Sequence, residues 1–167
     1  MRNIIGAIAH KVVEFADRYR VSNYKRWIVG KDYRLGDKVY ISHPKNISIG
    51  ERTYINSGML FASANAHINI GKDCLISYNV HIRTDMHNYM DAGKCINQQG
   101  TTEQDVTIED DVWIGYSVSI MPGVCIRKGS VIGTGAVVTK STDPYGVYVG
   151  IPARKIKSRG EEKSNEE

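Results

Sequence analysis

Histidine and cysteine, the side chains with the richest chemistry, are scarce in this chain of 167 residues. Its three cysteines (Cys74, Cys95 and Cys125) show no Cys-x-x-Cys spacing, so neither a disulfide framework nor a thiolate zinc site is expected. Of the five histidines, His87 lies in a polar stretch that covers roughly residues 86–105. An imidazole gains and loses a proton near neutral pH and can therefore act as an acid or a base. The residues alone leave a second interpretation open, a loop histidine without a role.

The composition is that of an ordinary globular domain. Hydrophobic residues make up 41% and charged residues 24%, which excludes wholesale disorder. Sixteen glycines against two Phe and two Trp favour strands and tight turns. Residues 1–30 hold six Lys/Arg and two acidic residues, and therefore carry the whole formal net charge of +4. No dense basic cluster with interleaved aromatic residues is present, so the sequence gives little support for nucleic-acid binding.

A bulky aliphatic residue recurs at every sixth position in the second half of the chain. The positions are Ile108, Ile114, Ile120, Ile126, Ile132 and Val138. Small or β-branched residues follow four positions after each of them, at Val112, Val118, Val124, Ser130, Ala136 and Thr142. The same spacing occurs earlier at Leu35 and Ile41, at Ile49, Ile55 and Phe61, and at Ile70, Ile76 and Ile82.

A period of six is neither helical nor simple strand alternation. It predicts a solenoid of short strands and turns, with the recurring aliphatic side chains pointing inward. Three hexads would form one coil of eighteen residues, which matches the separation of Gly115 and Gly133. The repeat is interrupted between Ile82 and Ile108, so residues 86–105 are expected to project as a loop. A long excursion from a compact repeat is more often functional than not.

The two ends of the chain depart from the repeat. Apolar residues at helical spacing predict an N-terminal helix with basic residues on its other face. These residues are Ile4, Ile5, Ile8, Val12, Phe15, Ala16 and Tyr19. We favour a cap over the open end of the solenoid, because that end must be covered. Docking to a membrane interface is the alternative. The run Arg154–Lys157 suggests a short closing helix, and residues 160–167 are expected to form a disordered polar tail.

The longest N-terminal apolar stretch, Ile4–Ala9, is too short for a secretion signal or a membrane span. Together with the unpaired cysteines, this predicts a soluble protein of the reducing cytoplasm.

Two segments resemble the hexapeptide-repeat acyltransferases: Asp111–Lys140, DVWIGYSVSIMPGVCIRKGSVIGTGAVVTK, and Val149–Lys157, VGIPARKIK. Their motif series is similar to that of the galactoside, maltose and surface-polysaccharide O-acetyltransferases. The resemblance implies an all-β solenoid, a left-handed parallel β-helix. The left hand comes from the resemblance alone, since crossover connections are usually right-handed. We therefore expect a helical cap (1–30), a β-helix domain (31–151) with the inserted loop, and a C-terminal basic segment and tail (152–167).

The resemblance also implies roles for individual residues. His87 ends the stretch IRTDMH, which is similar to the family's I-x-T-x-x-H, and would be the general base that takes the proton of a sugar hydroxyl. Tyr54 and Asn56 match a sugar-contacting stretch, although Asn56 could equally be a plain corner residue. Asn88 and Tyr89 are further acceptor-binding candidates because they follow His87.

The donor implied by the resemblance is acetyl-CoA, with no metal. Matching donor-binding positions are Trp113, Gly115, Thr134, Thr139, Lys140, Arg154 and Lys157. Tyr116 departs from the small residue that the galactoside branch carries there. For Lys140, a solvated lysine at a strand end is the alternative. The resemblance further implies a homotrimer whose active sites lie between subunits.

The sequence thus predicts an acetyl-CoA-dependent sugar O-acetyltransferase, in the synthesis of capsule, lipopolysaccharide or exopolysaccharide. N-acetylation of an amino sugar is the nearest alternative. A γ-type carbonic anhydrase could use His81 and His87 as zinc ligands, but no histidine follows His87 to supply a third. A non-catalytic β-helix with a binding surface would need ranked threonine rows, which the sequence lacks.

Overall fold

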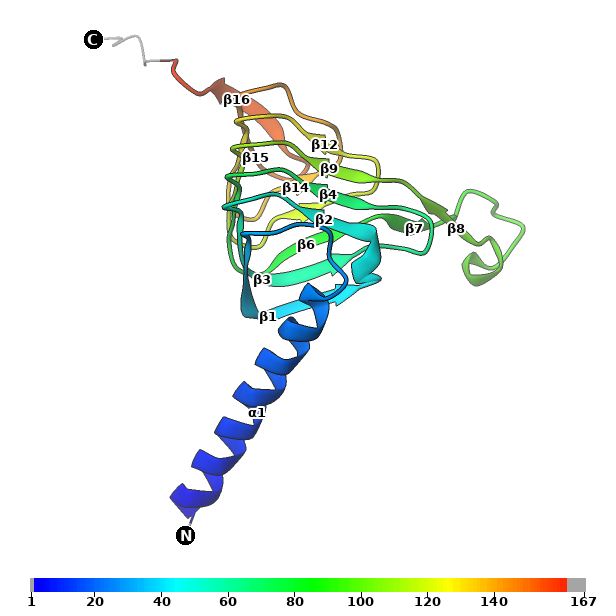
Figure 1. Ribbon diagram of the computed structural model, residues 1–167. Coiled ribbons are helices and arrows are strands. Elements are labelled where there is room, and N and C mark those ends of the chain that lie inside the picture. Colours follow the sequence, from blue (N-terminus) through cyan, green and yellow to red (C-terminus); the bar gives the residue numbers. More distant parts are fainter. Residues whose placement is uncertain (1, 162–167) are drawn as a thin grey trace.

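A computed structural model describes residues 2–161 of the chain, with side chains from residue 4 onward. Most of the predicted polar tail therefore lies outside the described residues. One helix, α1 (Arg2–Lys25), precedes a solenoid of short strands, as Figure 1 shows. There are also two short 3-10 helices. The first, η1 (Pro44–Asn46), lies at the corner between β1 and β2, and the second, η2 (Ile96–Gln98), lies in the projecting segment.

The solenoid is a prism with three faces. Face A is a sheet of parallel strands in the order β12 (Cys125–Ile126), β9 (Val106–Ile108), β4 (Ile68–Ile70) and β2 (Ile47–Ile49). A larger sheet forms the other two faces and bends between them, because β1 (Arg34–Ser42) and β3 (Tyr54–Phe61) each run around the corner.

Face B contains the starts of β1 and β3 and the strands that stack on them. These are β5 (Leu75–Ile76), β10 (Trp113–Ile114), β13 (Val131–Ile132) and β15 (Gly146–Val149). Face C contains the ends of β1 and β3, followed by β6 (Val80–Arg83), β11 (Ser119–Ile120) and β14 (Val137–Val138). Parallel stacking on three faces confirms the predicted β-helix, and the chain is an all-β solenoid of the left-handed hexapeptide type.

The strand register confirms the predicted eighteen-residue coil. Ile114 pairs with Ile132 on face B, and Ile120 pairs with Val138 on face C. On face A, Ile108 pairs with Ile126. Each pair consists of two hexad positions eighteen residues apart, so the inward aliphatic side chains form continuous columns through the core.

The predicted core is confirmed at nearly every hexad position. Ile108, Ile114, Ile120, Ile126, Ile132 and Val138 are each no more than 1% exposed. One assignment is wrong: Phe61 is 40% exposed, and Leu60 takes its place in the core at 1%. The corner before it contains Gly58, whose φ of 133° and contact with the Val80 backbone leave no room for a side chain. This corner is one residue shorter than a hexad requires, so the next inward position moves from Phe61 to Leu60.

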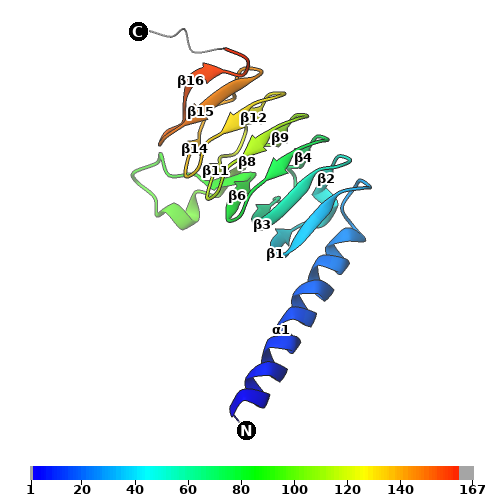
Figure 2. The ribbon, with the colours of Figure 1, turned by 90° about the vertical axis from the view of Figure 1, so that its left-hand side faces the viewer.

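Only the end of α1 packs on the solenoid. Val21 and the following Ile28 are 6% exposed. The Arg20 guanidinium lies 4.2 Å from the centre of the Tyr40 ring and donates a hydrogen bond to the Asp37 carbonyl oxygen. The preceding turns project away from the body (Figures 1 and 2). The cap expected from residues 1–30 is therefore limited to the last turns of α1 and the segment after it.

The other end of the solenoid is closed by a strand. The closing helix suggested by Arg154–Lys157 is wrong, because β16 (Arg154–Ser158) pairs antiparallel with β15. Lys155 lies opposite Tyr148 and Lys157 opposite Val147, so the backbone of β16 satisfies the last open edge of the sheet on face B. In the described range, no helix combines the length and apolarity that a bilayer span requires.

Candidate active site

A β-hairpin projects from the corner between faces C and A, where the sequence predicts the inserted loop (Figure 1). Its strands are β7 (Asp85–His87) and β8 (Thr101–Glu103), which pair antiparallel. His87 lies opposite Thr101 at the last pair of this register. Its side chain is exposed.

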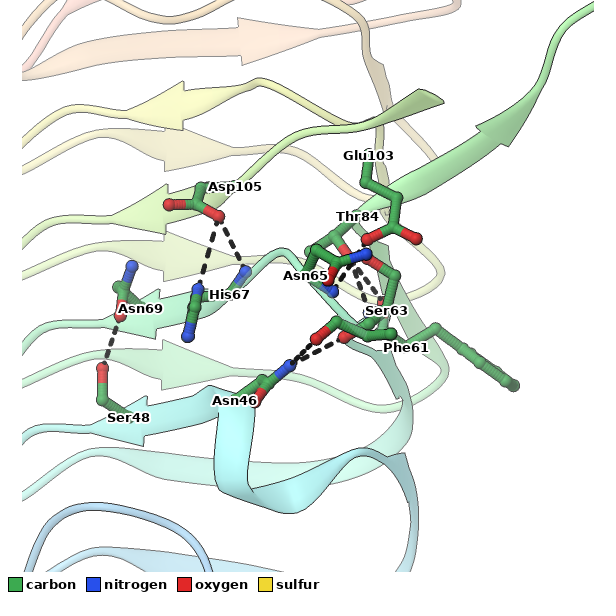
Figure 3. A network of polar contacts seen from close by, with 11 residues as sticks. Asn46, Ser48, Phe61, Ser63, Asn65, His67, Asn69, Thr84, Glu103 and Asp105 are labelled. Carbon is green, nitrogen blue, oxygen red and sulfur yellow. Dashed lines mark hydrogen bonds and ion pairs between the residues drawn. The ribbon is translucent and has the colours of Figure 1, made fainter. Parts of the chain in front are cut away.

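The base of the hairpin is fastened to the corner of the preceding coil (Figure 3). On the incoming side, the fully buried Thr84 accepts a hydrogen bond from the backbone N–H of Ser63 at 2.8 Å. On the outgoing side, Glu103 accepts from the N–H of Asn65 at 2.8 Å, and Asp105 accepts from the N–H of His67 at 2.7 Å. Both strands of the hairpin are thus fixed where they leave the solenoid. On the incoming side, the fixed residue Thr84 lies only three residues before His87.

Asn88 braces the hairpin from inside. Its Oδ1 accepts a hydrogen bond from Thr102 Oγ1 at 2.7 Å, and its Nδ2 donates to the Gln99 carbonyl oxygen at 3.1 Å. The Gln99 side chain in turn donates to the carbonyl oxygens of Asp91 and Lys94. Both ends of the Asn88 amide are therefore engaged within the hairpin, directly beside His87.

A cavity of about 800 Å³ lies between the hairpin and the neighbouring coils. From the hairpin, His87, Asn88 and Tyr89 line it, and from the coils Met121 and Thr139 do so. The structure therefore brings four of the predicted site residues together: His87, Asn88, Tyr89 and Thr139.

The predicted acceptor residues Tyr54 and Asn56 lie elsewhere in the chain. They line a smaller cavity of about 280 Å³ at the corner between faces B and C, together with Asp37 and Tyr78. The Tyr54 ring is covered by the Arg34 guanidinium, 5.0 Å from the ring centre. Within a single chain, Tyr54 and Asn56 therefore do not line the cavity beside His87.

The predicted donor positions form one group on face B and its corner with face C, a second group at the hairpin corner, and a third on β16. Trp113 is 55% exposed on face B, and Gly115 and Thr134 follow the face B strands at the corner between faces B and C. Thr139 and Lys140 follow β14, at the corner that carries the hairpin. Arg154 and Lys157 are both exposed, on β16 at the end of the solenoid. Face C separates the first two groups.

Comparison with known proteins agrees with this architecture. The family model "Bacterial transferase hexapeptide (six repeats)" matches residues 105–140. The crystal structure of a maltose O-acetyltransferase from Clostridium difficile 630 is 34% identical, with a TM-score of 0.74. The alignment covers 83% of this chain and 74% of that one. The chain belongs to the hexapeptide-repeat acyltransferases.

Two further structures of this kind contain a CoA ligand. A galactoside acetyltransferase in complex with coenzyme A is 31% identical, with a TM-score of 0.74 over 90% of this chain and 79% of that one. An acetyltransferase from Vibrio cholerae O1 biovar eltor, complexed with acetyl coenzyme A, is 29% identical. Its TM-score is 0.76, over 85% of this chain and 77% of that one. A search among curated proteins gave no match.

Gly115 of this acyltransferase also has a structural role. A Cβ atom at this position would lie 2.8 Å from the Thr134 backbone nitrogen and 2.9 Å from the Ile132 carbonyl oxygen. The next coil therefore passes too close for any side chain. Close coil stacking explains the glycine whether or not a ligand passes over it.

His81 lies apart from His87, on face C of the acyltransferase, with its ring 5.9 Å from that of Phe61. Burial lowers the pKa of the His81 imidazole, and the charge of Arg83 lowers it further. Among the side chains of residues 4–161, no three His, Cys, Asp or Glu groups are arranged to hold a metal ion.

Sequence reasoning missed the cavity-lining residues Met121 and Pro122. The hexad repeat could have indicated Met121. Met121 directly follows the hexad position Ile120, as Thr139 follows Val138, so the two side chains stack one coil apart. Comparing each predicted site residue with the residue eighteen positions earlier would have found Met121.

Proposed function

We propose that this acyltransferase moves an acetyl group from acetyl-CoA to a hydroxyl group of a sugar, with His87 as the general base. The sugar would belong to a surface polysaccharide under synthesis, and the reaction would take place in the cytoplasm. The observation that carries the proposal is the cavity beside His87, which is lined by residues of the hairpin and of the neighbouring coils. Hydrogen bonds at the foot of the hairpin hold it to the solenoid. The similarity to maltose and galactoside acetyltransferases supports a sugar acceptor.

The chemistry needs one well-placed base. Acetyl-CoA would supply an acetyl group activated as a thioester. As the acceptor oxygen bonds to the acetyl carbon, His87 takes the hydroxyl proton, and the C–S bond breaks to release the thiol of CoA. The exposed ring of His87 lines the cavity and can reach such a hydroxyl, and the hydrogen-bonded Asn88 keeps the strand that bears His87 in place. No residue of the chain needs to form a covalent intermediate.

The division of the site residues between two corners supports a homotrimer. Tyr54 and Asn56 lie at one corner and His87 at the other, with the width of face C between them. A complete site therefore requires the hairpin of one subunit to face the other corner of its neighbour. Exposed apolar side chains flank that second corner: Leu75 (55%), Tyr78 (56%), Trp113 (55%) and Tyr116 (52%). A surface of this kind is typical of a protein interface.

The same arrangement accounts for the donor positions. Trp113, Gly115 and Thr134 would line one wall of the groove between subunits, and Thr139 and Lys140 the other. A nucleotide phosphate needs Lys or Arg, and Arg154 and Lys157 are exposed cations on β16 near the end of that groove.

The test is release of free thiol from acetyl-CoA, measured over a panel of sugars and amino sugars. We expect sugar-dependent release that falls by about a hundredfold or more in His87→Ala. His81→Ala is the matched control, since it removes a histidine from the same stretch but away from the cavity, and it should retain most of the activity. Full activity in His87→Ala would refute the assigned base. A preference for amino sugars over sugars would show N-acetylation instead of O-acetylation.

A further inference from the structure

The N-terminal part of α1 carries an exposed apolar stripe. The stripe consists of Ile4, Ile5, Ile8, Val12, Phe15 and Tyr19, whose exposed fractions run from 58% to 71%. At 3.6 residues per turn, these side chains fall within an arc of about 100° on one side of the helix. Figures 1 and 2 show that this part of α1 stands clear of the solenoid, which therefore does not cover the stripe.

Basic residues border the stripe along one edge. Lys11, Arg18 and Lys25 are spaced seven residues apart, so they follow the same side of the helix. Of the acidic residues of this segment, Asp17 lies on the opposite face and pairs with Arg20 at 2.8 Å. Glu14 lies beyond the basic row and pairs with His10 at 3.3 Å and with Arg18 at 3.8 Å. For Lys11 and Lys25, the described side chains offer no ion-pair partner.

We propose that α1 docks the protein on an anionic membrane surface. The stripe would lie at the boundary between headgroups and acyl chains, with Lys11, Arg18 and Lys25 reaching the lipid phosphates. An apolar face bordered by cations is the pattern of helices that lie in the membrane interface. The free part of α1, residues 4–19, is roughly 24 Å long, so it can lie along the surface while Arg20 and Val21 hold it to the solenoid.

A second copy of the helix fits the stripe less well. In a coiled coil, the residues on either side of the apolar seam form pairs of opposite charge between chains. Here one side of the seam carries Lys11 and Arg18 and the other carries Ala9 and Ala16. The neighbouring helix would offer these cations no carboxylate, whereas anionic lipid offers one phosphate for each.

The test uses two adjacent valines with the same exposure. Val12 is in the stripe and 60% exposed, and Val13 is outside it and 58% exposed. Val12→Glu and Val13→Glu change the net charge and the helix propensity equally, so they differ only in the face that they alter. Each full-length protein is sedimented with vesicles of phosphatidylcholine containing about 30% phosphatidylglycerol, and with vesicles of phosphatidylcholine alone.

We expect the wild type to bind the anionic vesicles and to bind the neutral ones much more weakly. Val12→Glu should weaken binding by about tenfold or more, and Val13→Glu by less than about twofold. Phe15→Ala is a second variant that removes apolar area from the stripe without lowering helix propensity, and it should weaken binding as well. Acetyl transfer to a soluble sugar should be unchanged in all three, so failure of this proposal is distinguishable from failure of the proposed function.

Three results would overturn the proposal. The first is a wild type that fails to bind anionic vesicles. The second is an equal loss in both valine variants, which would mean that charge alone matters. The third is a fall in particle mass by light scattering in Val12→Glu, because the stripe would then be covered by a second copy of the chain.

Discussion

The hydroxyl oxygen of Thr84 lies 2.8 Å from both the backbone nitrogen and the hydroxyl oxygen of Ser63. This contact joins the start of the hairpin to the corner of the coil beneath it. Thr84 is 0% exposed, so its hydroxyl is a structural group that cannot touch a substrate in this position. We therefore expect Thr84 to act as a positioning residue for His87, by holding the strand that bears it.

Thr84→Val should uncouple these two parts. The isosteric change leaves the Ser63 N–H without its acceptor, which costs about 1–3 kcal/mol in the free energy of unfolding. A less well-held hairpin should lower kcat more than it raises the KM for acetyl-CoA. Thr84→Ser retains the hydroxyl and should restore most of the activity. Urea unfolding and steady-state kinetics measure both effects, and a Val variant with wild-type kcat would contradict the role.

Gly115→Ala should destabilise the solenoid. The new Cβ would lie 2.8 Å from the Thr134 nitrogen, a backbone atom that cannot move without shifting a coil. We expect a loss of about 1–3 kcal/mol in the free energy of unfolding. Gly6→Ala is the control, because nothing lies within 4 Å of a Cβ there. If the two variants melted at the same temperature, coil stacking would not explain Gly115.

Glu109 should contribute to acid sensitivity. The Lys128 backbone N–H, followed by the Arg127 guanidinium, holds the pKa of the Glu109 carboxyl below its usual range. The carboxyl of Glu109 therefore binds a proton more tightly in the unfolded chain than in the folded one. The contribution of Glu109 to the free energy of unfolding is complete above the unfolded pKa of about 4.3, and it is lost as the pH falls through the lower pKa of the folded state. The melting temperature of Glu109→Gln should be lower than that of the wild type at pH 7. The difference between the two melting temperatures should become smaller below pH about 4. A gap that stays constant with pH would contradict the linkage.

Mixed trimers should recover activity from two inactive variants. His87→Ala disables one corner of a subunit, and Asn56→Ala disables the other. If each site combines corners of two subunits, co-expression of the two variants should restore up to about one quarter of wild-type activity. In randomly assembled trimers, about one quarter of the sites combine an intact His87 corner with an intact Asn56 corner. Each variant alone should form particles of three times the chain mass. Inactive mixed trimers would contradict a site shared between subunits.

The sequence predicted the solenoid well because its information is local and repeated. Each inward isoleucine can be recognised from the six residues of its own hexad. The pairing of Ile114 with Ile132 follows from the coil length of eighteen residues. Phe61 was misassigned because the count fails where a corner is short. The run Arg154–Lys157 has no period, and its strand depends on an edge of β15 that only the folded chain provides.

The candidate site was predicted only in part. His87, Asn88 and Tyr89 are adjacent in sequence, so their common location in one hairpin could be expected. The hydrogen bonds of Asn88 to Thr102 and Gln99 depend on the register of the hairpin, which the sequence does not specify. The separation of Asn56 from His87 depends on which corner follows which strand, and only the folded solenoid determines this order.

The register of the coils is unchanged across the hairpin. Ile76 pairs with Ile114 and Ile82 with Ile120, in the same alignment in which Ile114 pairs with Ile132. The inserted segment therefore displaces no coil, and its two ends leave and rejoin the solenoid at neighbouring points of one corner. A different hairpin grafted between Thr84 and Asp105 would therefore reshape the wall of the cavity beside His87 and leave every column of the core in alignment.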